Sequence, residues 1–201
     1  LTGNPQITFF KVVYRRHTNF SMETIQQTLQ GASKLSTSEQ SGTVTISRNG
    51  DLLSDVFVST DAAMTRGDQL VREVDLEIGG QLIDRQTYEW VQIWNELTTP
   101  GAKQDAYKYM TKSHGDASSA NGRSGMAIYP LKFWFCRNPG LALPLIALQY
   151  HEVKINLQFR DAKDCYWTAC ANNSNPSWDC CVQLQSASLY VDYIYLDTDE
   201  R

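Results

Sequence analysis

The chain has 201 residues, of which 18 are Lys or Arg and 22 are Asp or Glu, so its formal net charge at pH 7 is −4. Composition and length are those of a globular protein with one large domain or at most two small ones. The acidic balance disfavours general binding to nucleic-acid phosphates, which needs a basic face, and no apolar run approaches the roughly 18 residues of a membrane-spanning helix.

Residues 1–19 are expected to form an N-terminal arm that packs on a neighbouring domain or subunit. Apolar side chains dominate residues 7–14, ahead of the first predicted core strand. The short basic cluster that follows is too small for a nucleic-acid element in an acidic chain. The residues assigned to this contact are Ile7, Phe9, Phe10, Tyr14, Arg15 and Arg16.

Alternation of apolar and polar residues, the period of a half-buried β-strand, is the dominant pattern in the chain. It is clearest over residues 150–160, where apolar Val153, Ile155 and Leu157 alternate with polar residues. The pattern predicts eight strands, at residues 20–29, 43–48, 52–59, 70–83, 128–136, 143–148, 150–160 and 182–196. In the last segment the apolar parity changes, which indicates a β-bulge near residues 185–186.

Three positions in this series are irregular. Met22, Ile25 and Leu29 recur at helical spacing, so the local pattern slightly favours a helix over a strand there. Asn49-Gly50 is typical of a hairpin turn between the second and third strands, because both residues tolerate a positive φ. Gly79-Gly80 indicates a bend within the fourth strand.

One helix is predicted at residues 88–97, ended by Thr99-Pro100-Gly101. Its apolar residues share one side, and we expect Trp90 and Trp94 to anchor it over one end of the sheets. Such a helix either closes that end or takes part in an interface. Residues 99–125 and 161–181 are rich in small and polar residues, and are predicted to be long surface loops.

Short strands, few helices and long loops together predict an all-β fold. The expected architecture is an eight-stranded antiparallel jelly-roll sandwich with one short helix and long end loops, because a single jelly roll fits this number of strands in this length. Neither an internal repeat nor a linker divides the sequence.

Motifs for metal binding and for common enzyme chemistry are sparse. The three histidines are far apart, and the five cysteines have neither the even count of a disulfide scaffold nor the spacing of a zinc site. The usual phosphate-binding, serine-hydrolase and zinc-peptidase motifs do not occur. We therefore predict no metal site and no cofactor, and we interpret the cysteines as reduced thiols.

One acidic pattern leaves an enzymatic alternative open. Glu73, Asp75 and Glu77 alternate along a predicted strand and resemble the ExDxE signature of laminarinase-type jelly-roll glycoside hydrolases. In such a site one carboxylate is the nucleophile and another the acid/base, with the aspartate tuning protonation. Acidic residues that merely face water give the same pattern, so the preferred prediction is that the chain is not an enzyme. A lectin-like binding module is a third, weaker interpretation.

Two sequons occur, at Asn19-Phe20-Ser21 and Asn172-Asn173-Ser174. The second lies in a predicted loop, so Asn172 is the candidate glycosylation site if the chain meets a glycosylation machinery. The first adjoins a predicted strand and is the weaker candidate.

Three segments of the chain resemble the major capsid protein of nucleocytoplasmic large DNA viruses. They are LTGNPQITFFKVVYRRHTNF at residues 1–20, FWFCRNPGLALPLIALQYHEV at 133–153 and YLDTDER at 195–201. Because these segments lie at both ends and in the middle, the resemblance covers the whole chain. It also favours a strand over a helix at residues 20–29.

The resemblance implies a structural viral capsid protein. Members of this family carry two jelly rolls in tandem, form trimers of pseudo-hexagonal outline and tile an icosahedral shell over an internal membrane. The chain matches the first roll, so residues 20–201 are expected to form a single jelly-roll domain, the first half of a double jelly roll. The chain stops where the connection to the second roll begins, which suggests a fragment of a longer protein.

The same resemblance implies the partners and the location. The chain would assemble with itself as a homotrimer and then as a capsid lattice, and would contact minor capsid proteins. It would bind no nucleic acid, and the internal viral membrane would lie nearby. The protein would reside in the virion capsid after assembly in the cytoplasm of the infected host cell.

Overall fold

The structure is a computed structural model that describes residues 6–7, 12–13, 18–31, 39–60, 69–111, 113, 126–161 and 187–197. Within these residues, eight strands have four or more residues. They are β3 (Phe20–Gln27), β5 (Gln40–Thr45), β6 (Leu52–Thr60), β7 (Val71–Ile78), β8 (Gln81–Thr87), β9 (Ala127–Pro130), β11 (Val153–Phe159) and β12 (Ala187–Leu196).

Shorter elements complete the described part of the chain. Four strands have two residues each: β1 (Gln6–Ile7), β2 (Val12–Val13), β4 (Gln30–Gly31) and β10 (Leu143–Pro144). The helices are α1 (Tyr88–Thr98) and α2 (Gly101–Thr111), with 3-10 turns η2 (Trp134–Cys136) and η3 (Pro139–Leu141).

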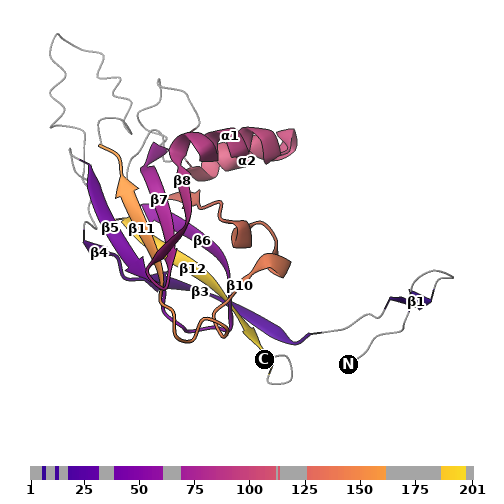
Figure 1. Ribbon diagram of the computed structural model, residues 1–201. Coiled ribbons are helices and arrows are strands. Elements are labelled where there is room, and N and C mark those ends of the chain that lie inside the picture. The colour runs from indigo at the N-terminus through magenta and orange to yellow at the C-terminus, as the bar shows by residue number, and fades with distance from the viewer. Residues whose placement is uncertain are drawn as a thin grey trace, which may run out of the picture.

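The long strands form two antiparallel sheets that face each other (Figure 1). In one sheet the order is β3-β12-β6, with β9 and β10 both pairing with β6; in the other it is β4-β5-β11-β7-β8. The chain crosses from sheet to sheet between successive long strands, except at the β7–β8 hairpin. This order is that of a jelly roll, which confirms the expected fold class.

The core fills the space between the two sheets, as the period-two pattern predicts. Ile155 and Leu157 of β11 are buried with Leu189, Val191 and Tyr193 of β12 in one continuous cluster. Their alternate neighbours along each strand are more exposed. Burial of each such aliphatic side chain contributes about 1.5–3 kcal/mol, so the alternating strands are the main source of stability.

The competition between helix and strand at residues 20–29 is resolved as a strand. All eight residues of β3 pair with β12, from Phe20 opposite Leu196 to Gln27 opposite Leu189. The backbone is thus satisfied by a neighbour that is distant in the sequence. The helical spacing of Met22, Ile25 and Leu29 is a local pattern and contains no information about this distant partner.

The predicted hairpin at Asn49-Gly50 is wrong, because β5 and β6 belong to different sheets. The segment is a crossover, and glycine is needed there for a close approach. A Cβ on Gly50 would lie 2.7 Å from the Cβ of Tyr193. The hairpin is instead at Gly79-Gly80, whose φ angles of 61° and 80° suit a type I′ turn, so the single strand predicted at 70–83 is two strands, β7 and β8.

The prediction of one helix is also wrong. The helix at 88–97 is confirmed as α1, but α2 occupies residues that were predicted to be a surface loop. Helix α1 ends at Thr98, and α2 begins at Gly101, the last residue of the predicted stop. Ala, Lys, Gln and Met in α2 are strong helix formers, a signal that the polar composition of the segment obscured.

Two other predicted strands are shorter than expected. Of residues 128–136, only those in β9 are strand, and the chain then enters η2. Of residues 143–148, only β10 is strand, and i→i+3 bonds such as Leu148 N–H to the Leu145 carbonyl follow it. The predicted bulge near 185–186, about half of the predicted loop at 99–125 and nearly all of the predicted loop at 161–181 lie outside the described residues. No helix within the described ranges is long and apolar enough to cross a membrane.

Candidate functional site

The three acidic residues of the glycosidase-like pattern share one face of β7, opposite the buried Val74 and Leu76. The β7–β8 register places Arg85 directly across from Asp75. Nε and Nη2 of Arg85 donate to the two carboxylate oxygens of Asp75, each at 2.7 Å. The same Nε lies 2.6 Å from Oε1 of Glu73, an ion pair without the angle of a hydrogen bond.

The third carboxylate is also engaged. Glu77 accepts a 2.7 Å bond from Nδ2 of Asn156 on β11, and the side-chain oxygen of Asn156 accepts from Thr43 of β5 at 2.9 Å. The hydrogen bond to Asp75 is the main reason that the pKa of Arg85 is raised, so this guanidinium stays charged and neutralises its neighbours. The arrangement is a structural network of ion pairs and hydrogen bonds across the four strands β5, β11, β7 and β8, which gives no support to a glycosidase site.

A cavity of about 430 Å³ borders this network. Its volume is in the range of ligand pockets, but such pockets are mainly apolar. Here charged residues of both signs are already paired: Arg72 forms an ion pair with Glu39, and the guanidinium carbon of Arg160 lies 4.4 Å from the centre of the Tyr88 ring. Glu73 is the only one of the three pattern carboxylates that reaches its wall.

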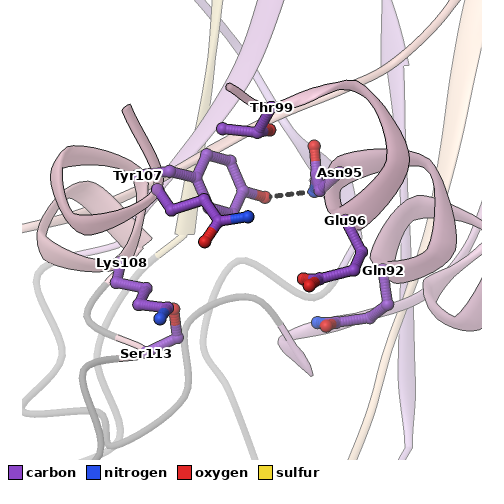
Figure 2. A pocket seen from close by; sticks show the side chains of 8 residues that line it. Gln92, Asn95, Glu96, Thr99, Tyr107, Lys108 and Ser113 are labelled. Carbon is purple, nitrogen blue, oxygen red and sulfur yellow. Dashed lines mark hydrogen bonds between the residues drawn. The ribbon is translucent and has the colours of Figure 1, made fainter. Parts of the chain in front are cut away.

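A second cavity lies between α1 and α2 (Figure 2). It measures about 180 Å³ and is lined by polar side chains, including Gln92, Glu96 and Lys108. Among its lining residues, Nδ2 of Asn95 donates a 2.6 Å bond to the Tyr107 hydroxyl, which ties the two helices together. The cavity is smaller than the roughly 300 Å³ at which ligand pockets begin, so we assign it no substrate.

Helix α1 has apolar side chains on both its inner and its outer side. It packs inward through Val91 and Asn95, whereas Trp90, Ile93 and Leu97 are exposed. Sequence reasoning found these apolar residues but assigned Trp90 and Trp94 the anchoring role. The signal it missed is the i, i+4 pair Val91 and Asn95, in which the asparagine is buried because Tyr107 satisfies its amide.

The thiol of Cys136 is chemically unreactive because it is largely buried. Burial raises the pKa of Cys136 to about 12, so the thiol stays protonated and is a poor nucleophile or metal ligand at neutral pH. The other four cysteines lie outside the described residues. Within the described part of the chain, no group of three or more His, Cys, Asp or Glu residues could hold a metal ion.

The other predicted site residues are mostly beyond what the structure describes. Ile7 lies in β1 and pairs with Val12 of β2. The remaining arm residues, Phe9, Phe10, Tyr14, Arg15 and Arg16, and the sequon residue Asn172 fall outside the described residues.

Comparison with known proteins agrees with this geometry. The family described as "Major capsid protein N-terminus" matches residues 8–197. The major capsid protein of Pyramimonas orientalis virus is 51% identical over 214 residues, which cover 100% of this chain and 50% of that protein. The major capsid protein of Paramecium bursaria Chlorella virus 1 is 40% identical, over 100% of this chain and 46% of that protein.

Solved structures give the same result. A structure titled "PBCV-1 virus capsid, quasi-atomic model" matches with a TM-score of 0.74 and 37% identity, over 96% of this chain and 46% of that one. The Faustovirus major capsid protein, with 12% identity and a TM-score of 0.64, shares the fold. The described fold is thus a jelly roll of the kind found in virus capsids. The chain belongs to the major capsid protein family and corresponds to its N-terminal part, spanning about half the length of the curated relatives it matches.

Proposed function

We propose that the chain is the N-terminal jelly roll of a viral major capsid protein that works by self-association. Copies form homotrimeric, pseudo-hexameric capsomers, which tile an icosahedral shell. The observation that carries this proposal is the match of fold and sequence over 96% of the chain to a virus capsid structure, with a TM-score of 0.74.

The proposed role is structural rather than enzymatic. The carboxylates of the acidic pattern are held by Arg85 and Asn156, and neither described cavity has the size and apolar lining of a substrate site. A shell subunit needs a rigid body and surfaces that fit its own copies. Because closed symmetry repeats each contact, interfaces that are individually weak suffice.

The finer organisation follows from the family resemblance. Residues 1–19 would be an assembly arm, and residues 20–201 a single jelly-roll domain that forms the first half of a double roll. Minor capsid proteins and the internal viral membrane would be neighbours in the virion. Assembly would take place in the cytoplasm of the infected host cell, without contact with nucleic acid.

Native mass spectrometry of the full-length protein tests the proposal. The expected result is a dominant homotrimer that forms larger assemblies as the concentration rises. A protein that stays monomeric at every concentration, under conditions in which it is folded, would contradict the proposed function.

A further inference from the structure

Helix α1 carries an exposed apolar surface that nothing in the described chain covers. Trp90 is 42% exposed, Ile93 54% and Leu97 78%, whereas Val91 on the inner side is 2% exposed. Ile93 follows Val91 by two residues, which is roughly 200° around a helix. We call the three exposed residues the α1 stripe.

The stripe is a firmly held surface. The Thr87 hydroxyl accepts from the Trp90 N–H at the start of α1, and Asn95 is bonded to Tyr107 of α2. The Trp90 and Trp94 rings lie 5.5 Å apart, and the Arg137 guanidinium carbon lies 4.3 Å from the centre of the Trp94 ring. The aromatic residues are therefore held in place before any partner binds, which lowers the entropy cost of association.

The size of the stripe suits the centre of a protein interface. With about 200 Å² for a large apolar side chain, its three members expose roughly 350 Å². A standard interface buries about 800 Å² on each partner, and its fully buried core is about 65% apolar. The stripe would supply a large part of that apolar core, and Trp is among the residues most enriched in interface hot spots.

The position of the stripe is also suited to contact between neighbours. Helix α1 follows directly after β8, which is the edge strand of its sheet, and α2 contacts β9. Both helices therefore lie on the flank where β8 and β9 are the outer strands of the two sheets (Figure 1). Strand β3 continues into β4 after two residues, so the other edges meet on the opposite flank. In a closed ring of copies, each subunit contacts its neighbours through its flanks.

We propose that a second copy of the protein covers the α1 stripe in the capsomer, an inference that rests on the self-association proposed above. The exposed Glu89 and Glu96 border the stripe, so the facing surface is apolar at its centre with cationic or neutral polar groups at its rim. This chain has a formal net charge of −4, so apolar burial rather than net charge attraction between two such chains holds the contact. Added salt should therefore leave it intact, since screening reduces the repulsion between copies.

The test compares full-length variants by sedimentation velocity. Ile93→Glu combined with Leu97→Glu places two charges in the stripe, on side chains that the fold does not bury. Ala102→Glu combined with Ala106→Glu is the matched control, since it adds two charges at exposed positions of α2, outside the stripe. We expect the double variant to melt as the wild type does and to weaken trimer formation about tenfold or more, with the control unchanged. A double variant that forms trimers as tightly as the wild type overturns the inference.

Hydroxyl-radical footprinting of the wild type identifies what covers the stripe. Labelling of Trp90 and Leu97 should fall several-fold when dilute monomers associate. Unchanged labelling on association, or protection already present in the monomer, overturns the inference, because the stripe then stays bare or is covered by its own chain. Either result leaves the proposed function standing if the wild type still forms trimers. A wild type that never associates overturns both.

Discussion

Gly50 has no side chain because the crossover from β5 to β6 passes against Tyr193. That ring is fully buried, and its hydroxyl donates a 2.6 Å bond to the Ser47 carbonyl. Gly50→Ala would force its Cβ to 2.7 Å from the Tyr193 Cβ, which is attached to the backbone and has little freedom to move. We expect a loss of about 1–3 kcal/mol in the free energy of unfolding, measured by urea denaturation.

Gly101→Ala is the matched control for that substitution. A Cβ at Gly101 meets nothing within 4 Å, and the position begins α2. Alanine there should leave stability unchanged or raise it by less than about 1 kcal/mol. Equal destabilisation by both substitutions would contradict the steric explanation.

Cys136 gives a residue-scale prediction about pH. Its pKa is raised from 9.0 to about 12, mainly by burial, so the folded state favours the neutral thiol. This contribution is complete below pH 9 and is lost as the pH rises towards 12. The stability difference between the wild type and Cys136→Ala should therefore shrink between pH 8 and pH 11, as measured by chemical denaturation at each pH. A constant difference would show that the thiol is not desolvated.

The acidic pattern on β7 predicts the absence of an activity. Glu73 and Asp75 are ion-paired with Arg85, and Glu77 accepts a hydrogen bond from Asn156, so the three carboxylates serve a structural network. We expect no hydrolysis of β-glucans by the wild type or by Glu73→Gln in a reducing-sugar assay. Hydrolysis by the wild type that the substitution abolishes would restore the glycosidase alternative.

At the scale of elements, the N-terminal arm carries the clearest prediction. Its apolar residues precede β3, a strand that is already fully paired with β12. Deleting residues 1–18 should leave the melting temperature nearly unchanged but reduce particle formation, as counted by electron microscopy. Normal particle yield from the deleted protein would argue against an assembly role for the arm.

Sequence patterns predicted elements well where one side chain in two is buried. β11 alternates along its whole length and β12 does so from Ala187 to Tyr193, and most of the predicted strands exist. Two of the errors occur where partners distant in the sequence determine the structure. Asn49-Gly50 has hairpin chemistry, but the sheets separate β5 from β6; Asp75 and Arg85 become neighbours only because the chain turns at Gly79-Gly80.

The direction in which α1 faces was harder to predict from the sequence than the presence of the helix. The helix at residues 88–97 was found from its apolar periodicity, which normally marks the buried face. In α1 the exposed Ile93 and Leu97 follow that periodicity, whereas the buried face carries Val91 and Asn95. A subunit that meets copies of itself has two kinds of apolar surface, and periodicity in a single sequence does not distinguish them.

At the scale of the whole molecule, the sandwich acts as a rigid block. Two sheets share one continuous core, and the ion pairs of β7 and β8 fasten strands on the outside. The helices and turns that carry exposed apolar groups are attached at the margins of this block. A subunit that tiles a shell requires both a packed body and apolar surfaces at its margins.

Electron microscopy of the purified full-length protein tests the central claim most directly. Class averages should show capsomers with a pseudo-hexagonal outline and threefold symmetry, with the present chain accounting for alternate corners of the ring. Particles that remain single, unassociated rolls at all concentrations, with the jelly roll intact, would contradict the account.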